Sequence, residues 1–142
     1  MNLTIKRIKL SKIDDYAKFV DTTTSRESKS FLAFIDSTSR LEACNDINVA
    51  RALTSAIGML AESGEYTEIL KKVVFQGKEF NEGERFHMKR ELGDILWYWV
   101  QGCLALGYTP DEVMDENINK LEARYPNGFE VARSEHREAG DI

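Results

Sequence analysis

Two short acidic segments stand out in this chain of 142 residues because each carries two carboxylates three positions apart. The first pair is Glu62 and Glu65, the second is Glu91 and Asp94, and each pair lies in a long stretch with helical character. Carboxylates on two helices that face the same space can hold a divalent cation, which assists phosphate-ester chemistry. Because all the ligands are oxygens, they favour Mg²⁺, or Mn²⁺, over zinc.

Counting about 100° per residue places both acid pairs on partly apolar helix faces. The face of Glu62 includes Ser55 and Ile69, and the face of Glu91 includes Tyr98 and Gly102. Acids three apart are most often part of a solvated face, but these pairs share their faces with residues typical of a core. Since uncompensated carboxylates repel one another and lose solvation, the pattern predicts a cation between the two helices.

A third helix offers positive charge. Thr109 followed by Pro110 is typical of a helix start, with a hydroxyl N-cap and proline in the first turn. The helix expected over 109–124 places Asn117, Lys120 and Arg124 on one face. An amide and two cations on that face could contact phosphate oxygens.

The apolar spacing predicts an all-α fold. Helices are expected over 12–20, 31–41, 46–77, 84–106 and 109–124. The Thr22–Ser25 stretch is expected to interrupt the helical pattern after the first of them. The helix over 84–106 is apolar on nearly every side, which suggests a subunit interface. The tail, residues 130–142, is polar and has no period, which is typical of a disordered segment or one that lies on a neighbouring subunit. A chain of this length favours one domain over 1–142.

Composition excludes several classes of function. A formal net charge of −5 gives no basic surplus for nucleic-acid binding. Cys44 and Cys103 are far apart and match no zinc spacing or disulfide framework, which fits a reducing cytoplasm. No apolar run is long enough to cross a membrane, and no targeting segment is recognised.

Other chemical constellations are incomplete. A di-iron bundle needs Glu-x-x-His on two helices, and only the Glu84–His87 word occurs. His87 alone is therefore interpreted as a surface or packing residue. Nucleotide-binding glycine loops and serine-hydrolase elbows are absent from the sequence. Trp97 and Trp99 are expected in the core or in an interface.

Taken together, the motifs resemble the MazG-like family of all-α nucleoside triphosphate pyrophosphohydrolases. The family signature is Glu-x-x-Glu, a spacer, then Glu-x-x-Asp. Three further short segments also match the family and occur in the expected order, namely Lys71-Lys72, Ile95-Leu-Trp-Tyr98 and Asn117-Ile-Asn-Lys120-Leu-Glu-Ala-Arg124. The resemblance covers about residues 46–130.

This resemblance implies a four-helix core with an extra N-terminal helix, in a homodimer or homotetramer. It implies Mg²⁺ held by Glu62, Glu65, Glu91 and Asp94, which would also be the catalytic residues, with Glu62 or Glu65 taking a proton from water. The reaction would cleave a nucleoside triphosphate between its α- and β-phosphates, giving monophosphate and pyrophosphate. Substrate would be bound by Lys72, Asn117, Lys120 and Arg124. The alternative is a non-catalytic helical oligomer that binds a nucleotide or a protein partner through the same pocket.

Overall fold

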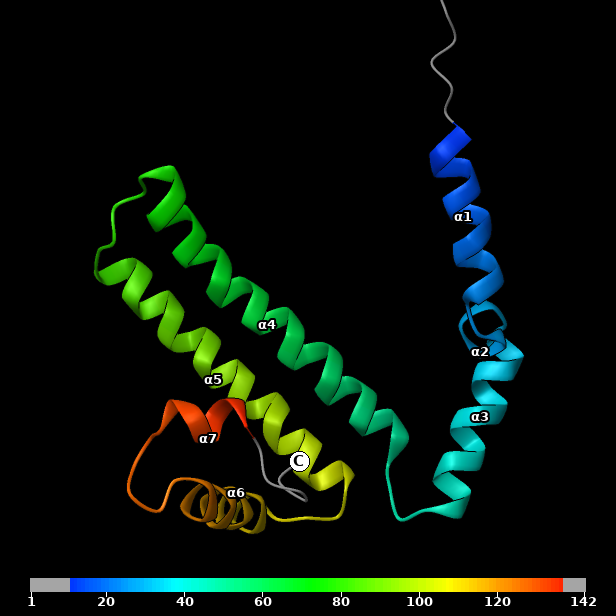
Figure 1. Cartoon of the computed structure of the whole chain (residues 1–142). Coiled ribbons are helices and arrows are strands. Elements are labelled where there is room, and N and C mark those ends of the chain that lie inside the picture. The colour runs from blue at the N-terminus through cyan, green and yellow to red at the C-terminus, as the bar shows by residue number, and fades with distance from the viewer. Residues whose placement is uncertain (1–10, 137–142) are drawn as a thin grey trace, which may run out of the picture. The chain divides into compact units, whose positions relative to one another are not determined.

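A computed structural model describes residues 11–136 of the chain. That part of the chain forms seven helices and no strand (Figure 1), so the expected all-α fold is confirmed. The expectations for the first ten residues and for residues 137–142 lie outside the described part. The chain divides into two compact units, residues 1–44 and 45–142. The number of helices in the core, the oligomeric state and the single-domain organisation stay predictions.

The first unit contains α1 (Ser11–Thr23), α2 (Arg26–Lys29) and α3 (Phe31–Cys44). The first helix ends within the threonine stretch, as predicted, but at Thr23 instead of near residue 20. The hydroxyls of Thr22 and Thr23 donate to carbonyls four residues earlier, at 2.8 Å and 2.9 Å, so both residues stay within the helix. In α3, Thr38 makes the same contact with the carbonyl of Phe34 at 2.9 Å, and the helix continues through its serine-rich middle.

The second unit is built on the antiparallel pair of α4 (Val49–Gln76) and α5 (Glu82–Ala105), which lie side by side (Figure 1). Asn48 caps α4 by accepting from the Arg51 N–H, and Gly77 ends it in the left-handed conformation, with φ of 69°. Asn81 caps α5. The two long helices therefore begin and end within a few residues of the predicted bounds.

Four residues bring α4 and α5 into close contact, and we name them the packed region: Ser55, Gly58, Tyr98 and Gly102. The Ser55 hydroxyl donates to the Tyr98 carbonyl at 2.7 Å. A Cβ at position 58 would overlap the Tyr98 ring, and one at position 102 would lie 2.7 Å from the Ser55 Oγ. Because neither glycine has a side chain, the backbones can approach closely and in one register.

Two further helices follow α5. The first, α6 (Pro110–Arg124), contacts α5 and begins with the predicted cap, a capping box between Thr109 and Glu112. The second, α7 (Val131–Glu135), lies in the polar tail, so disorder is not found for these residues, while the alternative that the tail lies on a neighbouring subunit stays a prediction. None of the described helices combines the length and the apolar character needed to span a membrane.

The outer faces of α4 and α5 carry exposed apolar side chains. Ile57 and Leu60 on α4 are 68% and 76% exposed, and on α5 Leu92, Leu96 and Trp97 are each more than half exposed. The described chain by itself therefore does not enclose α5 on most faces. Such a surface is compatible with the predicted subunit interface.

Candidate functional site

The α4–α5 register brings all four predicted acids together. Glu62 and Glu65 lie one turn apart on α4, and Glu91 and Asp94 lie one turn apart on α5. Carboxylate oxygens of Glu62, Glu91 and Asp94 lie within 4.8 Å of one another. Atoms of Glu65, Glu91 and His87 form a second group within the same limit. Glu91 belongs to both groups, so the four acids form one continuous acid cluster.

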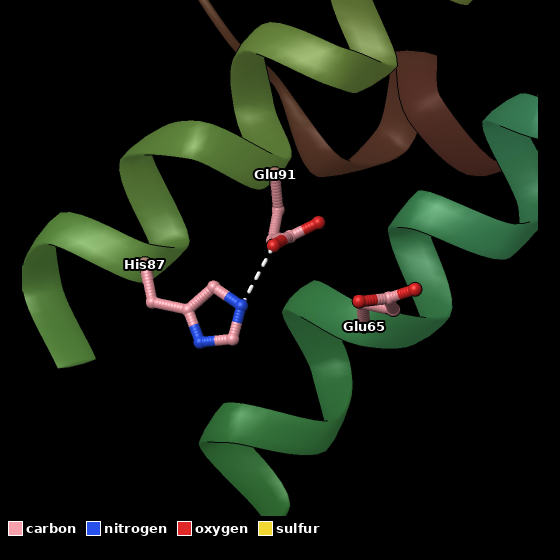
Figure 2. A group of neighbouring side chains, drawn as sticks. All are labelled: Glu65, His87 and Glu91. Atoms are coloured by element: carbon pink, nitrogen blue, oxygen red, sulfur yellow. Dashed lines mark ion pairs between the residues drawn. The ribbon is translucent and has the colours of Figure 1, made fainter.

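Glu91 is the most constrained member of the acid cluster. Its side chain is buried, with only 5% of the residue exposed. The carboxylate Oε1 lies 2.9 Å from His87 Nε2 (Figure 2), while Oε2 is buried and has no hydrogen-bond partner among the described residues. A buried carboxylate oxygen without a partner is costly and calls for an explanation, such as an ion. A divalent cation would supply the missing partner, so the residues present fit such an ion.

Charge crowding is visible at Glu62, which is half-buried. Its pKa is raised above the ordinary glutamate value, first because partial removal from water penalises the charged form. The neighbouring Glu91 carboxyl and the negative charges of Glu65 and Asp94 raise it further. A cation within the acid cluster would oppose this effect.

A cavity of about 320 Å³ opens beside the acid cluster, lined in part by Glu65, His87, Lys72 and Lys78. Lys72, a predicted substrate ligand, pairs with Glu68 at 3.4 Å, and Lys78 pairs with Glu84. The cavity wall thus carries acids that could hold a cation and lysines that could face an anion. This is the composition expected of a site for a phosphate compound with its metal.

The predicted α6 residues lie in a different place. Asn117 and Lys120 line a second cavity, of about 490 Å³, together with Trp99 on α5. The guanidinium of Arg124 lies over the Tyr125 ring, 5.9 Å from its centre. The two cavities share no lining residue. The structure therefore joins the four acids and Lys72, and places Asn117 and Lys120 together at another cavity.

His87 is the residue that the sequence interpretation missed. It is not simply a surface or packing histidine, because its Nε2 lies against Glu91 (Figure 2) and the residue is among those that line the cavity. The available signal was its spacing, since a residue four before Glu91 shares the same helix face. A single histidine gives no repeat by which to recognise it, so only the tertiary structure singles it out.

Comparison with known proteins gives two matches. The model of the MazG nucleotide pyrophosphohydrolase domain matches residues 52–129, which include both acid pairs, His87 and all of α6. The chain is also similar to the Gene 37 protein of Mycobacterium phage L5, with 29% identity over 83 residues, or 57% of this chain and 72% of the phage protein. No solved structure matches the chain significantly.

Proposed function

The chain belongs to the MazG nucleotide pyrophosphohydrolase family, and on that premise we propose that it hydrolyses nucleoside triphosphates between the α- and β-phosphates. The products are a nucleoside monophosphate and pyrophosphate, and the reaction depends on a divalent cation, Mg²⁺ or Mn²⁺. The substrate class includes ribo- and deoxyribonucleotides.

The observation that carries this proposal is the geometry around Glu91. Three acids from two helices place oxygens within 4.8 Å of one another, and one of these acids is buried with an oxygen that lacks a partner. A carboxylate buried only for a structural role normally has hydrogen-bond partners at both oxygens, unlike Glu91. The acid cluster is therefore suited to a hard cation.

Glu62, Glu91 and Asp94 would hold the cation, and Glu65 lies beside them on the cavity wall. When bound, Mg²⁺ neutralises phosphate oxygens and makes water a stronger nucleophile. The proton of the attacking water is taken on α4, by Glu62 or Glu65, which face Glu91 across the helix pair. His87 holds the Oε1 side of Glu91 and so limits how the carboxylate can rotate.

The leaving pyrophosphate needs positive charge. Lys72 and Lys78 lie on the wall of the cavity beside the acids, where their ammonium groups can offset the charge that develops on pyrophosphate. Asn117, Lys120 and Arg124 are also proposed to contact the substrate, and that assignment rests on the family resemblance. Their substitution tests whether the α6 cavity takes part in binding.

Product analysis over a panel of ribo- and deoxyribonucleoside triphosphates tests the proposal. With Mg²⁺ present, we expect monophosphate and pyrophosphate in equal amounts from at least one substrate. Glu91→Gln keeps the shape of the side chain and removes its charge, so kcat/KM should fall at least about 100-fold. Glu79→Gln, in the exposed loop before α5, is the matched control and should retain wild-type activity.

Release of orthophosphate would contradict cleavage of the α–β bond. Saturable Mg²⁺-dependent nucleotide binding without any product would instead identify a non-catalytic binding protein. Equal turnover by wild type and Glu91→Gln would separate the acid cluster from the reaction.

A further inference from the structure

The loop between α4 and α5 (Figure 1) contributes Lys78 to the cavity beside the acid cluster. Lys78 forms an ion pair with Glu84, which lies in the first turn of α5. In the proposed reaction Lys78 faces the leaving pyrophosphate, whereas Glu84 has no part. We propose that Glu84 is a positioning residue, which holds the Lys78 ammonium at the cavity to bind the terminal phosphates of the substrate and the pyrophosphate product.

The backbone at the end of α4 turns Lys78 back toward Lys72. Gly77 has a φ of 69°, a left-handed conformation that favours glycine. The turn allows the N–H groups of Gly77 and Lys78 both to donate to the Lys72 carbonyl, the second at 3.1 Å. Lys72 and Lys78 are thus joined through the same cap, and both line the cavity. The cap fixes the backbone of Lys78 but not the end of its flexible side chain.

Glu84 is far less exposed than the lysine that it contacts. Its side chain is 14% exposed, against 50% for that of Lys78. The Glu84 N–H donates to the Asn81 side chain at 3.3 Å, as part of the cap that begins α5. The helix dipole also favours a carboxylate in the first turn. Glu84 therefore offers Lys78 a partner whose own position is constrained.

The charges agree with this role. Contact with the Lys78 ammonium is the largest influence on Glu84 and lowers the pKa of its carboxyl, although partial removal from water opposes the effect. The carboxylate is thus charged at neutral pH. A lysine ammonium has three N–H donors, so a contact with Glu84 leaves donors for phosphate oxygens.

Lys72, the other lysine of the cavity wall, is held differently. It shares Glu68 with Lys71, and both of these pairs lie along the surface of α4 at spacings of four and three residues. Glu68 is more exposed than Glu84, and exposed pairs within one helix restrain a side chain only weakly. By contrast, Glu84 reaches Lys78 from a different element. An ammonium held in place before phosphate binds loses less conformational entropy on binding.

The inference rests on the proposed function for the position of pyrophosphate, but its test needs no turnover. Titration calorimetry measures the affinity of the full chain for inorganic pyrophosphate in the presence of Mg²⁺. Lys78→Met should lower this affinity at least about tenfold, because a charge-assisted hydrogen bond is lost. Glu84→Gln should lower it about three- to tenfold, because Lys78 is then free to move. Glu82→Gln removes an exposed charge from the same turn and should stay within about twofold of wild type.

A double variant separates positioning from a structural role. If Glu84 acts through Lys78, adding Glu84→Gln to Lys78→Met should change pyrophosphate affinity by less than about twofold. An equal loss with and without Lys78 would overturn the proposal, because Glu84 would then act on the fold alone. Glu84→Asp keeps the charge and should bind pyrophosphate more tightly than Glu84→Gln.

Unchanged affinity in a folded Glu84→Gln would also overturn the proposal. Tighter binding would do the same, because Glu84 would then compete with phosphate for Lys78. These results are distinct from a failure of the proposed function, which is decided by whether nucleoside triphosphates are hydrolysed to monophosphate and pyrophosphate.

Discussion

The packed region and the acid cluster lie along the same pair of helices, but they differ in what they contribute. The packed region favours close approach of α4 and α5, whereas the acid cluster opposes it. In the packed region, Gly58 faces the Tyr98 ring and Gly102 faces Ser55, with no room for a Cβ at either glycine. Beside the acid cluster, Gly64 and Gly93 have open space where a Cβ would lie. One part of the interface is held by close contact, and the other gathers like charges.

This difference indicates that the two regions of the helix pair have different roles. Close packing and the Ser55–Tyr98 hydrogen bond favour one register, and that register aligns Glu62 with Glu91 and Asp94. The acids themselves oppose the alignment, since crowding raises the pKa of Glu62. The packed region should therefore stabilise the fold. The acid cluster should lower the free energy of unfolding unless a cation is bound to it.

The largest expected effect is stabilisation by a divalent cation. At a free cation concentration 100 times its dissociation constant, the free energy of unfolding should rise by about 2.7 kcal/mol. Denaturant titration with and without Mg²⁺ measures this difference. Glu91→Gln should lose most of the gain, while Glu79→Gln should keep it; an equal gain in both variants would place the cation elsewhere.

Substitution of glycines tests the comparison directly. Gly58→Ala forces a methyl group against the Tyr98 ring, and overpacking of this kind typically costs about 1–3 kcal/mol. The better helix propensity of alanine offsets up to about 1 kcal/mol of that loss. We expect a net fall in the free energy of unfolding and weaker Mg²⁺ binding, because the register changes.

Gly93→Ala is the matched change beside the acid cluster. With open space around the new methyl group, it should raise the free energy of unfolding by about 0.5–1 kcal/mol. Thermal or denaturant unfolding of Gly58→Ala and Gly93→Ala shows whether each substitution raises or lowers the free energy of unfolding. If Gly58→Ala proved as stabilising as Gly93→Ala, close contact would not define the packed region.

A smaller effect is expected at the start of α6, away from both regions. Thr109→Ala removes the N-cap hydroxyl that accepts from the Glu112 N–H, and the free energy of unfolding should fall by about 1 kcal/mol. The backbone N–H of Thr109, followed by its hydroxyl, lowers the pKa of Glu112.

A lowered pKa in the folded state means that the charged Glu112 stabilises the fold above the ordinary glutamate pKa, about 4.3. The contribution is lost as pH falls through the lower, folded-state value. Glu112→Gln should therefore destabilise at neutral pH, and the gap to wild type should narrow in acid. A gap that does not change with pH would mean that the charge of Glu112 has no part in the cap.

Much of this arrangement could be predicted from the sequence because its signals repeat. Apolar spacing and caps such as Thr109-Pro110 locate the long helices. The face count places both acid pairs on partly apolar faces, and in the structure Glu91 is buried and Glu62 half-buried, while Glu65 and Asp94 are exposed. The first helix ends in the threonine stretch as predicted, but it continues to Thr23 because the Thr22 and Thr23 hydroxyls bond back to carbonyls within the helix. The short α7 carries no apolar period by which to detect it.

Other features depend on contacts between helices, which spacing within one helix does not encode. The role of Gly58 becomes evident only when Tyr98 is placed across from it. The contact of His87 with Glu91 is different, because it lies within α5 at a spacing of four residues, but a lone histidine at that spacing has several ordinary explanations. Asn117 and Lys120 line one cavity, as their shared face suggests, but where that cavity lies depends on how α6 docks on α5.

The most direct test of the account is the rate of pyrophosphate release from a nucleoside triphosphate, measured with and without Mg²⁺ for wild type, Glu91→Gln and Glu79→Gln. We expect Mg²⁺-dependent release by wild type and Glu79→Gln, and a loss of at least about 100-fold in Glu91→Gln. Unchanged release by a folded Glu91→Gln, or release that does not require a divalent cation, would contradict it.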